Sequence, residues 1–132
     1  MKTKYRNTDL DLISSHPIDQ LNQKLEAAGM VVLSYHQDSY GDWNTVLEII
    51  GDEENEFHGS FEATIAAMLD VLEALPVEEQ NLLEQCKTRE FNAAFDIGGA
   101  PFNFDQGLSS ETILRMAALK VSFRLTLYPQ HD

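Results

Sequence analysis

The side chains that could do chemistry in this 132-residue chain are one cysteine, four histidines and many carboxylates. A catalytic thiol needs a base within reach, and Cys86 has no histidine close to it in the sequence. It falls on the apolar side of an expected helix, so we predict a buried, unreactive thiol. The histidines show neither HxH nor HExxH spacing, and no Gly-x-Ser-x-Gly elbow occurs. We therefore predict no catalytic residue, no metal ligand and no cofactor, and the chain is not expected to be an enzyme.

The acidic segment from Gly51 to Ser60 has the composition of a calcium-binding loop but not the spacing of one. An EF-hand loop places oxygen ligands at alternate positions, with a central glycine and a closing glutamate. Here Asp52, Glu53 and Glu54 are consecutive. We interpret the segment as a solvated acidic surface loop.

The net charge of −13 is distributed very unevenly along the chain. Between Leu25 and Cys86 there are fourteen Asp or Glu residues and no Lys or Arg, whereas the two flanking segments are almost neutral. This balance argues against nucleic acid or an anionic membrane as a direct partner. It leaves two interpretations, which are solubility alone and a field that attracts a basic partner.

These residues must be positioned by elements that the apolar periodicity predicts. Alternating or continuous apolar runs indicate strands, and three- and four-residue spacing indicates helices. The predicted strands are 9–13, 30–35, 45–50, 89–97 and 123–128, and the predicted helices are 17–28, 61–75, 76–86 and 110–121. This order, β-α-β-β-α-α-β-α-β, predicts a single α+β domain over residues 1–132. Its one mixed, mainly antiparallel sheet has about five strands, includes a split β-α-β unit and has helices packed on one face.

The pattern near the C-terminus adds finer expectations. Ser109 or Ser110 should cap the last helix, and a short return strand is possible at Phe102–Phe104. The last helix should carry Ile113, Leu114, Ala117 and Val121, and Phe123, Leu125 and Leu127 of the last strand should face inward.

If helices cover one face of the sheet, strand parity predicts which side chains lie on the other. That open face should carry five carboxylates and a single base, with Asn92, Thr126 and Tyr128 nearby: Asp9, Asp11, Glu48, Glu90, Asp96 and Arg124. Arg124 should pair with Glu90 or Asp96. Such a face could receive basic side chains, although an uncovered sheet face is polar in any case.

We therefore predict a non-enzymatic, acidic protein-interaction domain that binds a basic partner protein. The carboxylates expected to contact it are Glu48, Asp52, Glu53, Glu54, Glu56, Glu90 and Asp96. Opposite fields speed capture and strengthen close charge pairs. Two alternatives stay open. One is a housekeeping or regulatory module that forms a homodimer through a sheet edge or aromatic patch, and the other is a small hydrolase.

Three motifs stand out between residues 89 and 129: Phe95–Gly98, the helix cap Gly107–Glu111 and the closing strand Phe123–Pro129. With these motifs, the segment resembles a family of small uncharacterised bacterial α+β domains. Several members of that family are toxin-neutralising immunity proteins without assigned enzymatic residues, so the resemblance implies an immunity-like inhibitor. The first ten residues lack an apolar signal stretch and one cysteine cannot form an internal disulfide, which predicts a cytoplasmic protein.

Overall fold

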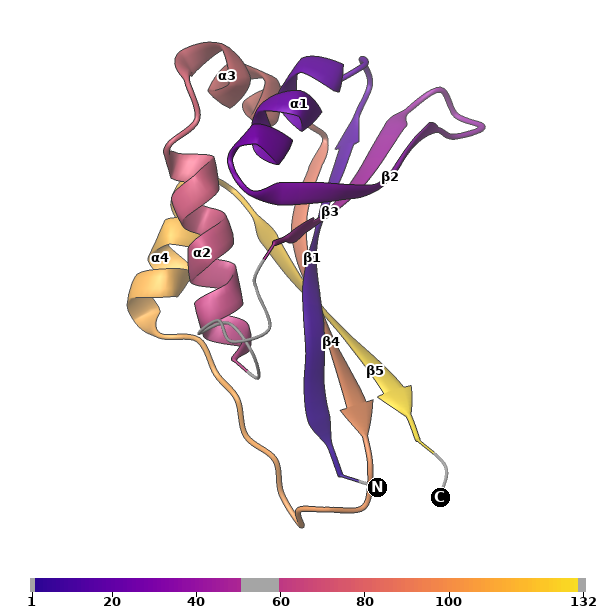
Figure 1. The fold of residues 1–132 in the computed structure, drawn as a ribbon, viewed down its shortest axis with the longest axis vertical. Helices are drawn as coiled ribbons and strands as arrows, with labels where there is room; N and C mark the ends of the chain where they lie inside the picture. The colour runs from indigo at the N-terminus through magenta and orange to yellow at the C-terminus, as the bar shows by residue number, and fades with distance from the viewer. Residues whose placement is uncertain (1, 51–59, 131–132) are drawn as a thin grey trace.

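The computed structural model describes residues 2–50 and 60–130. Its elements follow the predicted order and confirm the α+β class (Figure 1). The strands are β1 (Lys4–Ser14), β2 (Met30–Gln37), β3 (Trp43–Ile49), β4 (Thr88–Ile97) and β5 (Ser122–Pro129). The helices are α1 (Asp19–Ala27), α2 (Phe61–Glu73), α3 (Val77–Gln85) and α4 (Ser110–Ala118).

The five strands form one sheet in the order β2-β3-β1-β4-β5. The three pairs among β2, β3, β1 and β4 are antiparallel, and β4 pairs with β5 in parallel. Because β1 and β2 are each antiparallel to β3, they run in the same direction with β3 between them. This is the predicted split β-α-β unit, and it leaves β2 and β5 as the two edges of the sheet.

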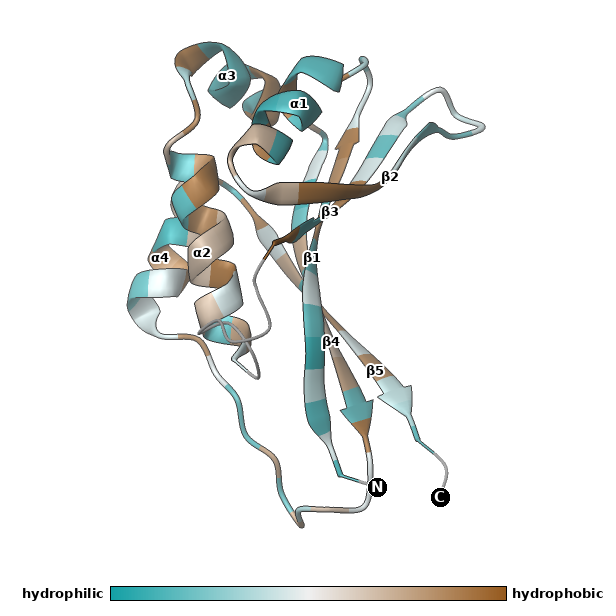
Figure 2. Ribbon diagram, in the orientation of Figure 1, coloured by the Kyte–Doolittle hydropathy of each residue, from teal (hydrophilic) through white to brown (hydrophobic). Residues whose placement is uncertain are grey.

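The helices lie on one side of this sheet, and the core fills the space between the two layers (Figure 1). Alternation in β1 turns Leu10 and Leu12 inward, where neither side chain is exposed. The apolar stripe of α2 is also buried: Phe61, Ile65, Met68, Leu69 and Leu72. Figure 2 shows apolar residues along α2 and hydrophilic residues over much of α1. Within the described residues, no helix combines the length and apolar character needed to cross a bilayer.

Local side-chain and backbone chemistry defines three of the helix ends. Ser60 caps α2 by accepting a hydrogen bond from the backbone N–H of Ala63 at 3.2 Å. Ser109, the first of the two candidates, caps α4 in the same way. Gly29 follows α1 with a φ of 108°, a left-handed conformation that favours glycine.

The prediction of a short return strand at Phe102–Phe104 is wrong. That segment has no strand structure, because both sides of β4 are already paired, with β1 and with β5. The segment crosses from the end of β4 to α4 instead. The ring of Phe102 is fully exposed, while Phe104 packs edge-on against Phe95 with their centroids 5.9 Å apart.

The apolar residues expected on the last helix do not make up the buried side of α4, and Val121, which is buried, lies after the helix ends. The helix buries Thr112 and Met116, whereas Ile113 and Leu114 are exposed. Polar contacts with α2 fix this rotation. The hydroxyl of Thr112 donates to a carboxylate oxygen of Glu62 at 3.0 Å, and Arg115 pairs with two acidic residues of α2.

Three apolar residues of β5 face the helix side as predicted but are not buried there. Phe123 packs against Phe61 at a centroid distance of 6.2 Å, yet it remains exposed together with Leu125 and Leu127. The edge strand extends past the surface that the helices cover.

Candidate interaction surface

The open face of the sheet holds the carboxylates that strand parity places there. Asp9 lies opposite Asn92, and Asp11 lies between Val46 of β3 and Glu90 of β4. Glu48 is on β3, and its carboxylate shares a hydrogen-bond donor with Asp9. We call these four carboxylates the acidic strip: Glu48, Asp9, Asp11 and Glu90. The predicted contacts Asp52, Glu53, Glu54 and Glu56 lie outside the described residues.

Asp9 is the most perturbed group of the acidic strip. Partial burial, followed by repulsion from Glu48 and Asp11, raises its pKa to about 6. The amide of Asn7 donates to Asp9 at 3.1 Å and to Glu48 at 2.7 Å, so it bridges the two carboxylates without supplying a charge. Among ion pairs between described residues, none includes Asp9 or Glu48.

The other half of the acidic strip is partly neutralised. Burial and the charge of Glu90 raise the pKa of Asp11, while Arg124 and Asn92 act in the opposite direction. The predicted ion pair of Arg124 forms with Glu90, at 2.7 Å. An exposed pair of this kind is worth at most about 1 kcal/mol.

Asp96 shares the open face but is engaged by local partners. The amide of Gln130 donates to its carboxylate at 3.1 Å, and Arg6 lies 3.6 Å away. The guanidinium of Arg6 also sits 4.7 Å from the centre of the Tyr128 ring, in cation–π geometry. Asp96 is therefore a weaker candidate for a partner contact than the acidic strip.

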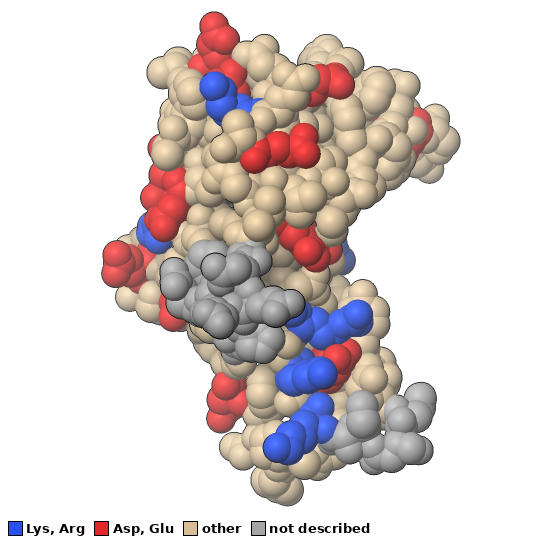
Figure 3. Space-filling view, viewed as in Figure 1, with Lys and Arg blue, Asp and Glu red and all other residues tan. Residues whose placement is uncertain are grey.

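The prediction that Arg124 is the single base of this face is wrong. Arg6 reaches the face because it is the extra residue of a bulge between Tyr5 and Asn7. A hollow of about 590 Å³ on the open face is lined by Asp11 and Glu90 together with four cations: Lys87, Arg89, Lys120 and Arg124. Figure 3 shows the outline indented on this side of the sheet, with Lys and Arg gathered where β1 begins. The open face thus has an acidic centre with cations at both ends.

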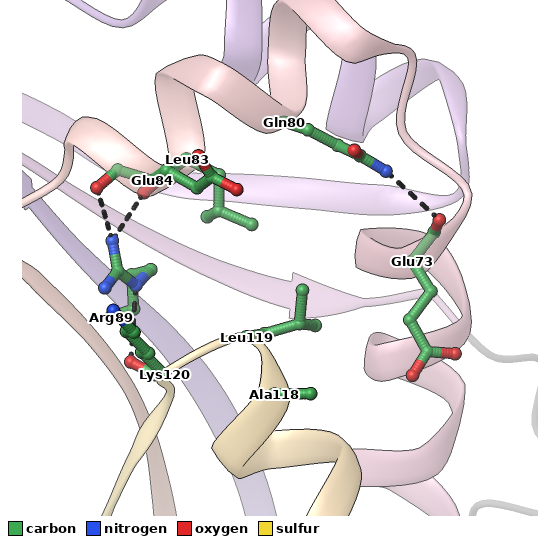
Figure 4. A pocket seen from close by; sticks show the side chains of 8 residues that line it. All are labelled: Glu73, Gln80, Leu83, Glu84, Arg89, Ala118, Leu119 and Lys120. Carbon is green, nitrogen blue, oxygen red and sulfur yellow. Dashed lines mark hydrogen bonds between the residues drawn. The ribbon is translucent and has the colours of Figure 1, made fainter.

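Arg89 was not singled out by the sequence, and its role is structural. Its Nη1 donates to the carbonyls of Leu83, Glu84 and Cys86 at 2.8–3.1 Å, and its Nε donates to that of Lys120 at 3.3 Å. Figure 4 shows this guanidinium at one side of a hollow of about 500 Å³ between the ends of α2, α3 and α4. A base shortly after a helix end is the signal that could have found it.

The other groups that could do chemistry are buried or already bound to partners within the chain. Cys86 is buried as predicted, which raises its pKa to about 11, so the thiol is protonated. In the hairpin turn, Asp38 accepts hydrogen bonds from two backbone N–H groups and from Asn44, and Asp42 pairs with Lys87 at 2.8 Å. Across residues 2–50 and 60–130, no three His, Cys, Asp or Glu side chains gather to hold a metal ion.

Comparison of the chain with protein-family models, with curated proteins and with solved structures gives no match.

Proposed function

We propose that this chain is a non-enzymatic protein-interaction domain whose acidic strip binds a basic partner protein. The observation that carries the proposal is the pair Asp9 and Glu48. These carboxylates share one uncharged donor, Asn7, and repulsion between them contributes to the raised pKa of Asp9. A lysine or arginine from a partner would relieve that repulsion. It would not have to displace a cation of this chain from the two carboxylates first.

The cations around the acidic strip would orient the partner rather than prevent binding. Lys87 and Arg124 are already paired with Asp42 and Glu90, so they add little free positive charge. A partner that presents a basic side chain to Asp9 and Glu48, flanked by acidic ones, would match the pattern along the face. Such complementarity sets register and association rate more than it sets affinity.

The test uses a short poly-arginine peptide as the cationic probe. The variant Asp9→Asn/Glu48→Gln removes two charges from the acidic strip, and the control Glu26→Gln/Glu111→Gln removes two exposed charges from α1 and α4. Calorimetry should show about tenfold weaker binding for the strip variant and a much smaller change for the control. Equal losses in both variants would mean that only the overall field attracts the peptide, and the proposal would fail.

The same site gives a pH signature. Because the pKa of Asp9 is raised to about 6, acidification from pH 7 to pH 5 should protonate this group and weaken peptide binding. The single variant Asp9→Asn should lose most of that pH dependence. A parallel pH profile in the wild type and in Asp9→Asn would remove Asp9 from the binding surface.

We further propose that the partner is a basic toxin and that the chain acts as an immunity-like inhibitor in a bacterial cytoplasm. The net charge of −13 and the sequence resemblance support this choice. Neutralising the carboxylates between Asp52 and Glu56 should slow association with such a toxin and flatten its salt dependence. An unchanged association rate at low salt would reject a role for that segment.

A further inference from the structure

We propose that a second copy of this chain pairs antiparallel with the free edge of β5. The product is a two-fold symmetric dimer with one continuous sheet. This proposal does not depend on the acidic strip. It rests on the backbone edge of β5, on the apolar surface beside it and on the symmetry that joins the two.

The edge formed by β5 lacks the devices that protect the other edge of the sheet. Strand β2 carries a register shift between Val32 and Ser34, and such a bulge twists an edge away from further pairing. Strand β5 pairs with β4 in unbroken register from Ser122 to Pro129. Its one charged side chain is Arg124, which lies on the open face next to Glu90. A regular eight-residue edge of this kind is a template for a further strand.

An exposed apolar patch adjoins this edge on the helix side. On β5 it comprises Phe123, Leu125 and Leu127, which are 42%, 51% and 52% exposed. On α4, Ile113 is a further exposed apolar side chain, at 51%. The largest exposed apolar patch on a protein is often a functional surface.

The orientation of α4 places Ile113 and Ala117 toward the same edge. Arg115 faces α2, because its guanidinium contacts Asp70 at 2.6 Å and Glu73 at 2.8 Å. Each residue of an α-helix turns by about 100°, so the positions two residues before and after Arg115 lie on the opposite side. Those positions are Ile113 and Ala117, and both are exposed on the side of α4 away from α2.

A second copy covers this surface better than an isolated strand would. A two-fold axis perpendicular to the sheet keeps both helix layers on the same side and brings the two α4 helices toward each other. The partner then supplies both a strand for the edge and an apolar helix side for Ile113 and Ala117. A lone peptide strand would supply only the first.

The side chains that lie opposite each other in such a dimer are compatible neighbours. With Leu125 opposite its own counterpart, Phe123 lies opposite Leu127 of the second copy, and Arg124 lies opposite Thr126. No like charges face each other, and each cross-strand apolar pair is favourable. The dimer would bury these exposed apolar side chains together with the eight-residue backbone edge of β5. A stable interface needs about 800 Å² from each partner, so the facing sides of the two α4 helices must also contribute.

The dimer also has a characteristic response to salt. Each copy carries a net charge of −13, so association works against repulsion between the two molecules. Added salt should therefore strengthen self-association, whereas it should weaken the binding of a cationic partner to the acidic strip. The two proposals can consequently fail independently.

Sedimentation velocity over a concentration series tests the dimer. The variant Leu125→Glu places a charge at the centre of the interface. The control Leu33→Glu places one on β2, at a side chain that is 52% exposed against 51% for Leu125. We expect the wild type and Leu33→Glu to dimerise, more tightly at high salt, and Leu125→Glu to dissociate about 100-fold more readily. A wild type that stays monomeric at millimolar concentration, or a Leu125→Glu variant that dimerises normally, would overturn the proposal.

A second variant covers the case in which Leu125→Glu fails to fold. Leu125 lies on the symmetry axis, so Leu125→Cys should form a disulfide-linked dimer on mild oxidation, with the buried Cys86 unreactive. Leu33→Cys is the matched control. Equal crosslinking of the two variants would contradict pairing at β5.

Discussion

At the scale of single residues, the open face stores an unfavourable interaction at Asp9. The carboxylate is partly buried, lies beside Glu48 and Asp11, and has a pKa raised to about 6. The protonated form is therefore favoured in the folded state relative to the unfolded chain. The stabilisation from this proton is fully present below the unfolded pKa of 3.8 and is lost as the pH rises through 6.

We predict that Asp9→Asn stabilises the fold at pH 7.5 by about 1 kcal/mol, a value discounted for solvent screening. Urea unfolding of the wild type and the variant at pH 7.5 and at pH 4 measures the difference. The gain should vanish at the lower pH, because the wild-type carboxyl is then protonated. Glu26→Gln, on the exposed side of α1, serves as the control and should change little at either pH.

Arg89 shows the opposite case, a charge whose contacts hold the fold together. We predict that Arg89→Ala destabilises the protein by about 2–3 kcal/mol, because it leaves several carbonyls at the ends of α3 and α4 without their donor. Arg124→Ala, which removes an exposed ion pair, should cost less than about 1 kcal/mol. Chemical denaturation of both variants checks the ranking, and an equal cost would contradict the structural role of Arg89.

At the scale of elements, the sequence predicted best where one signal dominated. The apolar stripe of α2 and the alternation of β1 and β4 are unambiguous, so the elements and the faces of Asp9 and Asp11 follow from periodicity. In α4 two faces compete, and a contact distant in sequence, Thr112 to Glu62, decides between them. No local pattern shows such a contact.

The acidic strip could be anticipated by parity, but its surroundings could not. The bulge at Arg6 breaks the alternation on which parity depends. Lys87 and Lys120 reach the open face from the turns before β4 and β5, which only the folded chain brings together.

The sequence offered two residues for the N-cap of α4, and the structure selects Ser109. Ser109→Ala should destabilise the protein by about 1 kcal/mol, because the hydroxyl accepts the N–H of Thr112 at 3.2 Å. Ser110→Ala lies one residue inside the helix and should be nearly neutral. Thermal unfolding of the two variants distinguishes them, and a larger loss in Ser110→Ala would move the cap.

At the scale of the whole molecule, repulsion that arises from the net charge of −13 opposes folding. We predict that raising the salt concentration to about 0.5 M increases the unfolding temperature, because screening weakens repulsion among the carboxylates. Calorimetric scans at low and high salt measure the effect. Asp9→Asn/Glu48→Gln should show a smaller increase, and a decrease in the wild type would contradict net repulsion.

The central place of β1 has a consequence for biosynthesis. This strand leaves the ribosome before either neighbour, yet β3 begins at Trp43 and β4 at Thr88, so its two edges are closed at very different times. The backbone groups of β1 that pair with β4 wait until Thr88 and the residues after it have been made, and such an unpaired edge invites misassembly with other nascent chains. Two carboxylates on one face, Asp9 and Asp11, make a strand a poor seed for aggregation. The same two carboxylates that repel each other in the folded protein thus disfavour aggregation of the strand during synthesis.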